Sequence, residues 1–324
     1  MKIMLTLLAL LVGLASAQNP TVRLALDWVP NTNHTGIYVA LAKGWYEEAG
    51  VDLQILPYGS VPPEALVANG QAEVAVSGSE GVLTSVVTKE PIVSVAAILS
   101  TNTAALAVLE ESGITRPAEL DGKIYAAYGG NYEDAVISAI LEHDGGTGEF
   151  KSALLNVAGF DALLAGRADF VWIFEGWQGV QAEREGIALR LFNFTEYGIP
   201  DYYTPNLVSS QSTIESKGDA LRAFMAATSR GYTFAAENPE EAAELLLEAA
   251  PAGSFPDPDL VRKSQAFVSQ YYIKEGEAWG FQRAEMWQGY QGMLLDAGVY
   301  GDKTEALRAA VEDGSLYTND LLPE

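Results

Sequence analysis

Aromatic, acidic and amide side chains gather in four short segments, and each segment follows a stretch with the residue pattern of a β-strand. The segments are Asp27–His34, Ser77–Glu80, Tyr128–Glu133 and Glu175–Gln178. Aromatic planes can stack on a flat ring, while a few carboxylates and amides fix its orientation through hydrogen bonds. These residue types therefore indicate a site for a small molecule.

Two indoles, Trp28 and Trp177, stand among polar residues in these segments, so we expect them to face a ligand; packing into the core is the alternative. Trp45 and Trp172 fall within a predicted helix and strand and are expected to be core residues. Glu175 comes directly after an apolar run, at the strand end where α/β proteins bind ligands. For Glu175 the alternative is a solvated surface acid.

Residues suited to catalysis or to metal binding are scarce. The chain has no cysteine and two histidines, and it contains no phosphate-binding glycine loop, H-E-x-x-H or G-x-S-x-G motif. His143 is expected at the end of a helix, where an imidazole favours the dipole. For His34, helix capping or a structural hydrogen bond competes with ligand contact. We expect no catalytic residue, no metal and no cofactor.

The charge balance argues against a nucleic-acid partner. The chain has 324 residues, 43 acidic and 19 basic, with a formal net charge of −24. Such a chain repels a phosphate backbone, so we expect no nucleic-acid partner. Its length and its apolar fraction of 48% favour two domains or one large domain.

The N-terminal residues Met1–Ala17 combine the positive Lys2, the apolar run Ile3–Leu14 and a final A-S-A. This pattern predicts a secretory signal peptide cleaved after Ala17; a buried N-terminal helix is the alternative. The apolar run is shorter than the roughly 20 residues that a membrane-spanning helix needs. Because the chain has no cysteine to accept a lipid, we expect a free periplasmic protein without a lipid anchor.

Strands and helices alternate in two successive units, and the chain from Thr213 onward is mostly helical. This order predicts an α/β fold with largely parallel sheets, arranged as two lobes around a cleft. The predicted strands are Thr21–Leu26, Val51–Leu56, Ala72–Val76, Ile92–Leu99, Ala105–Leu109, Lys123–Ala127, Leu154–Val157, Ala168–Phe174 and Leu189–Phe194. The predicted helices include His34–Glu48, Glu64–Asn69, Gly81–Thr88, Asp134–His143 and Asp161–Ala165.

The resemblance of this chain to a known family rests on these stretches: Leu26–Ala40, Lys43–Tyr46, Trp172–Trp177, Pro200–Pro205, Arg230–Ala235, Asn238–Ala243, Trp279-Gly280 and Trp287. They resemble the NMT1/THI5-like group of ABC-transporter substrate-binding proteins. The resemblance extends over essentially the whole mature chain and implies a type II periplasmic-binding-protein fold with a helical C-terminal part. It implies a lobe I of residues 18–104 and 208–324 and a lobe II of residues 105–207.

Members of this family bind hydroxymethylpyrimidine or formylaminopyrimidine, which are thiamine precursors, and relatives bind riboflavin or small sulfonates. The resemblance thus implies a monomeric receptor for a small molecule, which it delivers to an ABC permease with a cytoplasmic ATPase. We expect a thiamine pyrimidine precursor as ligand, with riboflavin, another heteroaromatic or a sulfonate as alternatives. The expected ligand-binding residues are Trp28, Asn33, His34, Ser77, Glu80, Tyr128, Asn131, Tyr132, Phe174, Glu175, Trp177 and Tyr203.

Each role follows from the same resemblance. Trp28, with either Trp177 or Tyr132, is expected to stack on the ring, and Glu175 to accept a hydrogen bond from the exocyclic amine. Two further residues are expected to address the ring nitrogens or the substituent: Asn33 and Ser77.

The family also contains a eukaryotic enzyme that makes the pyrimidine phosphate by consuming one of its own histidines, with a cysteine-rich loop nearby. The corresponding segments here, Ser77–Leu83 and Tyr202–Val208, contain no histidine and no cysteine. We therefore expect a binding protein and not an enzyme. A synthase, or a hydrolase that uses Glu175 with His34, is the alternative.

Overall fold

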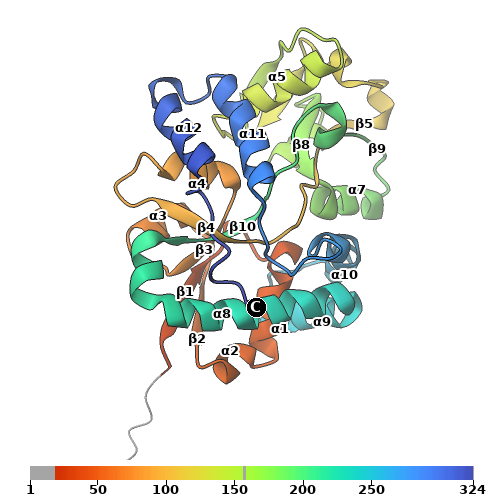
Figure 1. Ribbon diagram of the computed structural model, residues 1–324. Helices are drawn as coiled ribbons and strands as arrows, with labels where there is room; N and C mark the ends of the chain where they lie inside the picture. Colours follow the sequence, from red (N-terminus) through yellow and green to blue (C-terminus); the bar gives the residue numbers. More distant parts are fainter. Residues whose placement is uncertain (1–18, 156–157, 324) are drawn as a thin grey trace, which may run out of the picture.

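The computed structural model describes residues 19–155 and 158–323, which fold around two five-stranded sheets (Figure 1). In the first sheet, β1 (Thr21–Ala25) lies between β2 (Asp52–Leu56) and β3 (Val74–Ser77), and these three strands are parallel. The strand β10 (Asn206–Ser210) pairs antiparallel with β3 on one side and with β4 (Ile92–Ala97) on the other. The strand order is β2-β1-β3-β10-β4.

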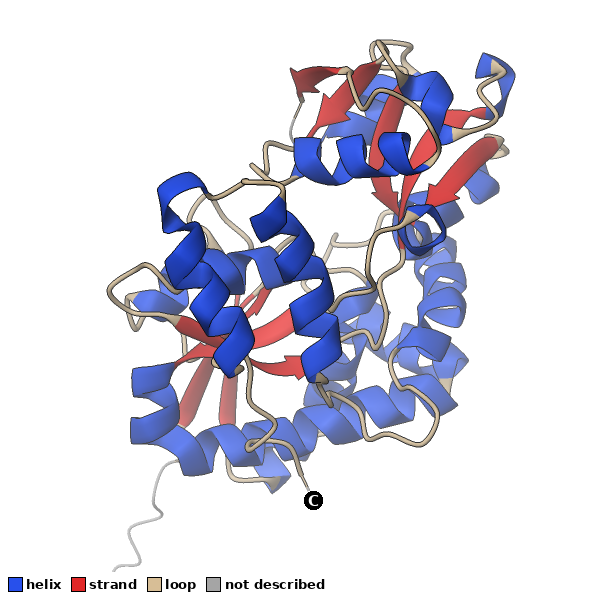
Figure 2. Cartoon of the chain, turned by 45° about the horizontal axis from the view of Figure 1, so that its top comes forward, coloured by secondary structure: helices blue, strands red, loops and turns tan. Residues whose placement is uncertain are grey.

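The second sheet has the order β7-β6-β8-β5-β9. Its strands β6 (Ile124–Ala127), β7 (Lys151–Leu154) and β8 (Phe170–Phe174) are parallel. The strand β5 (Ala104–Leu109) runs antiparallel to both β8 and β9 (Leu189–Asn193). Figure 2 shows the strands as two separate groups, each with helices around it.

The chain leaves the first sheet after β4 and returns to it at β10, so two passages join the sheets. We call the parts built on the first and second sheets lobe I and lobe II. The predicted two-lobed α/β fold is thereby confirmed, while the residue limits of the lobes stay a prediction. The α-helices between the passages are α5 (Glu133–His143), α6 (Gly159–Leu164) and α7 (Val180–Glu185). The others are α1 (Thr35–Ala42), α2 (Trp45–Glu48), α3 (Pro63–Ala68), α4 (Ser79–Ser85), α8 (Gln211–Glu237), α9 (Pro239–Ala249), α10 (Pro258–Val268), α11 (Ala284–Asp296) and α12 (Thr304–Asp313).

Helices α1 and α8 cross in contact at two glycines. A Cβ added to Gly231 would lie 2.0 Å from the carbonyl oxygen of Gly36, and one added to Gly36 would lie 2.2 Å from the Tyr232 ring. The Tyr232 ring in turn stacks on the buried Trp279 at 4.3 Å. The missing side chains therefore let the two helix backbones approach closely.

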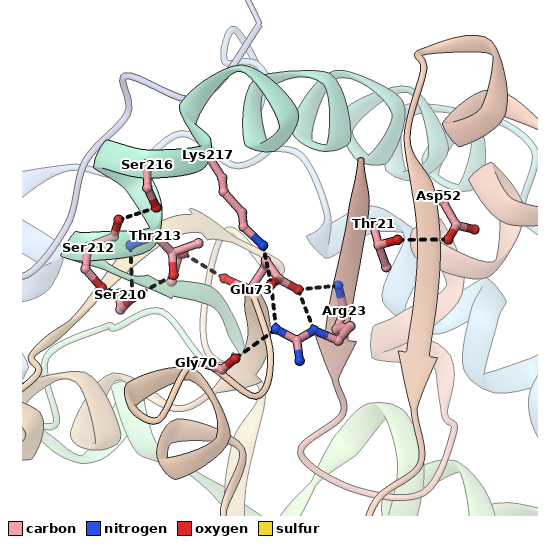
Figure 3. A network of polar contacts seen from close by, with 11 residues as sticks. Thr21, Arg23, Asp52, Gly70, Glu73, Ser210, Ser212, Thr213, Ser216 and Lys217 are labelled. Atoms are coloured by element: carbon pink, nitrogen blue, oxygen red, sulfur yellow. Dashed lines mark hydrogen bonds and ion pairs between the residues drawn. The ribbon is translucent and has the colours of Figure 1, made fainter. Parts of the chain in front are cut away.

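An ion network around the buried carboxylate of Glu73, the residue before β3, joins β1 and α8 (Figure 3). Arg23 donates from Nη2 to Glu73 Oε1 at 2.7 Å and from Nε to Glu73 Oε2 at 3.0 Å, and Lys217 Nζ donates to Oε1 at 2.8 Å. Lys217 has non-helical backbone angles, at a kink in α8. Burial alone would raise the pKa of Glu73, but the hydrogen bonds from these two cations outweigh it and lower the pKa to about 2.

Three sequence predictions need correction, and one strand was missed. The helix expected over His34–Glu48 is divided, because Gly44 has φ +70° and separates α1 from α2, and the exposed Leu41 does not join an apolar stripe. The loop expected at Glu175–Gln178 is a π-helix, η5 (Glu175–Gly179). Strand β10 was not predicted. The strand expected at Leu154–Val157 ends at Leu154 as β7, and positions 156–157 lie outside the described residues.

In the described part of the chain, no helix combines the length and the apolar character needed to cross a membrane. The predicted signal peptide, Met1–Ala17, lies outside the described residues.

Candidate ligand-binding site

A cavity of about 280 Å³ lies between the lobes, at the carboxyl ends of β1, β3, β6 and β8. All four segments that the sequence analysis singled out contribute to its wall. Seven of its thirteen lining residues are aromatic, and three are acidic. They are Asp27, Trp28, Tyr58, Gly78, Glu80, Tyr128, Tyr132, Glu133, Trp172, Phe174, Gln178, Tyr202 and Thr204.

The lobe II side of the cavity is an aromatic wall around Trp172. This indole packs edge-on against Phe194 at 4.4 Å and against Tyr132 at 6.0 Å. Tyr128 lines the cavity beside it and donates its hydroxyl to the Trp172 carbonyl at 3.0 Å. The indole N–H of Trp172 is buried and has no hydrogen-bond partner among the described residues.

The loop after β1 is held from behind by hydrogen bonds to lobe I. The N–H of Asn31 donates to Nδ1 of the buried His34 at 3.2 Å, so Nδ1 is unprotonated and Nε2 donates to Asp27 Oδ1 at 2.9 Å. The hydroxyls of Tyr272 and Tyr232 donate to the loop carbonyls of Thr32 and Asn33, each at 2.6 Å. His34 therefore orients Asp27, which faces the cavity.

Glu133 is a carboxylate whose acceptors are already used. It accepts from the Tyr125 hydroxyl at 2.6 Å, from the Tyr128 N–H at 2.9 Å and from the N–H of Gly130. These bonds close the loop between β6 and α5, which brings Tyr128 and Tyr132 to the cavity. Glu133 thus contributes to the site indirectly, because it holds the loop that carries Tyr128 and Tyr132.

Glu80 is the buried carboxyl on the lobe I side. Its Oε1 accepts from the Tyr290 hydroxyl at 2.7 Å, and the Tyr290 ring stacks on Tyr202 at 3.6 Å with an interplanar angle of 8°. Burial is the main cause that raises the pKa of Glu80, and the hydrogen bond from Tyr290 opposes it. Tyr202 lines the cavity, and its buried hydroxyl has no partner in the described chain.

A second cavity of about 540 Å³ adjoins the first. Gly78, Glu80 and Tyr132 line both, so these residues form the boundary between the two spaces. Asn131 lies in the wall of the second cavity and is exposed, and Glu64 lies in the same wall with its Oε1 accepting from Ser77 at 2.5 Å.

Of the twelve predicted site residues, five line the first cavity and Asn131 lines the second. The five are Trp28, Glu80, Tyr128, Tyr132 and Phe174. Three of the others lie behind the loops: Ser77 is fully buried against Glu64, His34 binds Asp27, and Asn33 donates its N–H to Asn31.

The remaining three predicted residues, Glu175, Trp177 and Tyr203, pack elsewhere. Glu175 accepts from Asn193 at 3.0 Å, outside the cavity wall. Burial, and next to it the charge of Glu196, raises the pKa of Glu175. The hydroxyl of Tyr203 accepts from the Arg283 N–H at 3.1 Å.

Trp177, which is expected to face a ligand, lies outside the wall of this cavity and is half-buried, so its contact with a ligand stays a prediction. Its indole packs on an apolar cluster of lobe I that includes Tyr38, Leu246 and Val261. The reason is the turn made by η5, which presses Gly176 against α10: a Cβ there would lie 2.4 Å from Val268. This turn directs Gln178 to the cavity instead. Its Oε1 accepts from the Phe174 N–H at 3.1 Å, which leaves its amide N–H groups as donors.

Sequence reasoning missed eight of the lining residues. Trp172 was assigned to the core because it lies in a strand, although it also lines the cavity. Tyr58 follows β2 at the same sheet edge, and that position could have identified it. Four others lie in the predicted site segments without being predicted as contacts: Asp27, Gly78, Glu133 and Gln178. The last two, Tyr202 and Thr204, gave no comparable signal.

Within the described residues, no group of three or more His, Asp or Glu side chains is placed to hold a metal ion. The cavity can therefore be described from its own donors and acceptors. It offers indole, phenol and amide donors, acidic acceptors and aromatic faces.

The comparisons with known proteins agree with this architecture. The chain is 30% identical over 274 residues to the formylaminopyrimidine-binding protein of Halalkalibacterium halodurans, covering 83% of this chain and 82% of the relative. It is 26% identical to a 4-amino-5-hydroxymethyl-2-methylpyrimidine phosphate synthase of Legionella pneumophila, covering 95% and 94%. The alkanesulfonate-binding protein SsuA from Xanthomonas axonopodis, bound to MOPS, matches with a TM-score of 0.67 at 14% identity, over 94% of this chain and 100% of that one.

Two α/β lobes with a polar–aromatic cavity between them define a periplasmic-binding-protein fold, the class of the solute-binding components of transporters. The family model described as NMT1/THI5 like matches residues 31–242. The chain belongs to the NMT1/THI5-like family, as its sequence predicted.

Proposed function

We propose that this protein is the solute-binding component of an ABC importer and that its ligand is a thiamine pyrimidine precursor, either hydroxymethylpyrimidine or formylaminopyrimidine. The relative from Halalkalibacterium halodurans, which is named for binding formylaminopyrimidine, supports the ligand class. The cavity supports it independently, because aromatic faces and edge-directed polar groups suit a single flat heteroaromatic ring.

The observation that carries this proposal is the charge of the cavity wall. Asp27, Glu80 and Glu133 line it, and in the described part of the chain its wall contains no lysine, arginine or histidine. An anionic ligand would lose its hydration there and meet carboxyl groups without a compensating cation. The wall therefore favours a neutral or cationic ring over a sulfonate or a phosphorylated pyrimidine.

Transport through a two-lobed receptor requires that the ligand bind the closed state more tightly than the open state. The cavity wall draws residues from both lobes, with Trp28 and Glu80 on one side and Tyr132 and Trp172 on the other. A ring between them contacts all four only when the lobes are together, which supplies that difference in affinity. The closed form would then present a composite surface to the permease.

An exported, receptor-type role is supported by the N-terminal pattern of charge, apolar run and A-S-A at residues 1–17. Solved structures with the same fold are titled as periplasmic binding proteins, among them the aliphatic sulphonate-binding protein of Escherichia coli. We place the protein in the periplasm, cleaved after Ala17, where it serves an ABC permease and its ATPase as a monomer.

A pyrimidine synthase is the competing function, because relatives at 23–26% identity carry that name. A synthase must hold a phosphorylated product, which the acidic cavity wall disfavours. The imidazole of His34 is also fully buried, with both nitrogens engaged by Asn31 and Asp27, so it is not free to react. These observations favour binding without turnover.

The deciding experiment is mass spectrometry of the ligand released from the purified protein, followed by titration calorimetry. We expect an unaltered pyrimidine at up to one equivalent, and binding of hydroxymethylpyrimidine or formylaminopyrimidine. Riboflavin, MOPS and hydroxymethylpyrimidine phosphate are the comparison ligands. Tighter binding of riboflavin or MOPS, or conversion of the pyrimidine, would overturn the proposal.

A further inference from the structure

Glu80 occupies the boundary between the two cavities, and its surroundings are unusual for a carboxyl group. The residue is 7% exposed, and within the described chain the one hydrogen bond to its carboxyl group from another residue comes from Tyr290. Its second oxygen, Oε2, lies against Gly78, where an added Cβ would be 2.8 Å away. Gly78 and Glu80 both line the two cavities, so the carboxyl group lies in the wall of the space that a ligand would enter.

Among the described residues, no cation pairs with the carboxyl group of Glu80. The titratable groups around it are tyrosines and other acids, and neither cavity wall contains a lysine, arginine or histidine in the described part of the chain. A charge buried without a partner is costly, so the neutral acid is the favoured form. The surrounding groups are Tyr132, Tyr202, Tyr290, Tyr300, Glu64, Asp27 and Glu133.

An aminopyrimidine presents two adjacent hydrogen-bonding groups, a ring nitrogen that accepts and an exocyclic amine that donates. A carboxylate offers acceptors only, so one of its oxygens would face the lone pair of the ring nitrogen. A neutral carboxylic acid offers one donor and one acceptor side by side. It matches this edge at both positions.

We propose that the Glu80 carboxyl, held in place by Tyr290, binds the amine-bearing edge of the ligand as a neutral acid. Its Oε2–H donates to the ring nitrogen, and its Oε1 accepts both the Tyr290 hydroxyl and the exocyclic amine. This inference rests on the proposed function. It makes Glu80 the residue that selects an aminopyrimidine over rings that lack the amine, and it replaces Glu175 as the anchor of that group.

The substitutions Glu80→Gln and Glu80→Leu test the proposal, because a glutamine amide keeps one donor and one acceptor, whereas leucine keeps neither. The probe is 4-amino-5-hydroxymethyl-2-methylpyrimidine, and the comparison ligand is the same ring without the amine. We expect Glu80→Gln to bind the probe within about threefold of the wild type and Glu80→Leu to lose about 10–100-fold, as for two lost hydrogen bonds. For Glu80→Leu, the preference for the amino compound should disappear.

The pH dependence of binding provides a second measurement that does not depend on the leucine variant folding. Wild-type affinity should fall at alkaline pH as Glu80 ionises, whereas the Glu80→Gln affinity should follow only the titration of the probe itself. Glu175→Gln is the matched control and should retain the wild-type profile. Tyr290→Phe should weaken binding in the wild-type background, because it frees Oε1 from its positioning bond.

The outcomes distinguish a failure of the proposed function from a failure of the proposed role of Glu80. If wild-type protein binds no aminopyrimidine, the proposed function fails and this inference fails with it. If it binds, but Glu80→Leu retains full affinity and the preference for the amine, only the role of Glu80 is overturned. Loss of binding in Glu80→Gln, with wild-type binding that persists at alkaline pH, would show that Glu80 acts as a charged carboxylate and would overturn the neutral form.

Discussion

Trp28 and Trp177 are both indoles in segments that follow strands, yet the structure gives them different surroundings. Trp28 lines the cavity, whereas Trp177 packs on the apolar cluster of Tyr38, Leu246 and Val261. Which way an indole faces depends on the turn that carries it, and the sequence does not specify that turn. The two residues therefore form a matched pair for separating ligand contact from packing.

Trp28→Ala should weaken binding of hydroxymethylpyrimidine by about 1–3 kcal/mol, the range of base–aromatic stacking, with little change in stability. Trp177→Ala should instead lower the free energy of unfolding by about 2–4 kcal/mol, because it removes a large apolar side chain from a packed cluster. Calorimetric titration and urea unfolding of both variants check this. The reverse assignment of the two effects would contradict the cavity described above.

Tyr202 and Trp172 show which properties of single residues could not be predicted from the sequence. Both carry a buried polar atom without a partner in the described chain, and both line the cavity. Trp172 could be predicted as buried from its place in an apolar strand. Its unpaired N–H could not be predicted, because it depends on Phe194 and Tyr132 occupying the space around the ring.

At the scale of elements, the alternation of strands and helices predicted both sheets, since period-two and helical patterns are local properties. Strand β10 was missed because its pairing with β3 and β4 depends on the return of the chain from lobe II. The four site segments were predicted because parallel strands place their carboxyl ends at one edge. The π-helix η5 was missed because packing of Gly176 on α10, a contact distant in sequence, defines it.

The crossing of α1 and α8 gives a prediction at this scale. Gly231→Ala should lower the free energy of unfolding by at least about 1–3 kcal/mol, because the new Cβ would overlap the carbonyl oxygen of Gly36. Gly292→Ala in α11 is the control, since no atom lies within 4 Å of its added Cβ. Alanine in that helix interior should stabilise by about 0.5–1 kcal/mol. Equal effects in urea unfolding would contradict the close approach.

The Glu73 network joins three elements and gives a pH dependence. Its folded-state pKa of about 2 lies below the ordinary 4.5, so its stabilisation is complete above pH 4.5 and is lost as the pH falls toward 2. The corresponding contribution at neutral pH is about 3 kcal/mol. Glu73→Gln should therefore be less stable than the wild type at pH 7, with the difference shrinking toward pH 3.

Glu241→Gln is the control for that measurement, because Glu241 pairs with Lys43 at 2.6 Å while remaining largely exposed. An exposed pair contributes about 0–1 kcal/mol, so this variant should stay close to the wild type at every pH. A Glu73→Gln difference that does not depend on pH would show that the network stabilises by shape alone.

At the scale of the whole molecule, the lobes meet on one side through α10. Arg184 of α7 donates from Nη2 to Asp257 Oδ1 at 2.9 Å, and Ser264 donates to the carbonyl of Gly176. Thr32, in the loop after β1, pairs with Ser264 at 2.6 Å. The same serine therefore connects lobe II to the loop that carries Trp28, which couples the approach of the lobes to the shape of the cavity.

This coupling predicts that ligand occupancy and lobe closure change together. Two passages of the chain between the sheets allow a hinge rotation, and a ring bound between Trp28 and Trp172 stabilises the closed state by contacts that the open state lacks. Small-angle scattering should show a smaller radius of gyration when hydroxymethylpyrimidine is added to ligand-free protein. Trp28→Ala at subsaturating ligand should show a smaller decrease, whereas Glu175→Gln should match the wild type. Saturated binding without compaction would mean that the lobes are already closed before the ligand enters, and the receptor would then need another way to report occupancy.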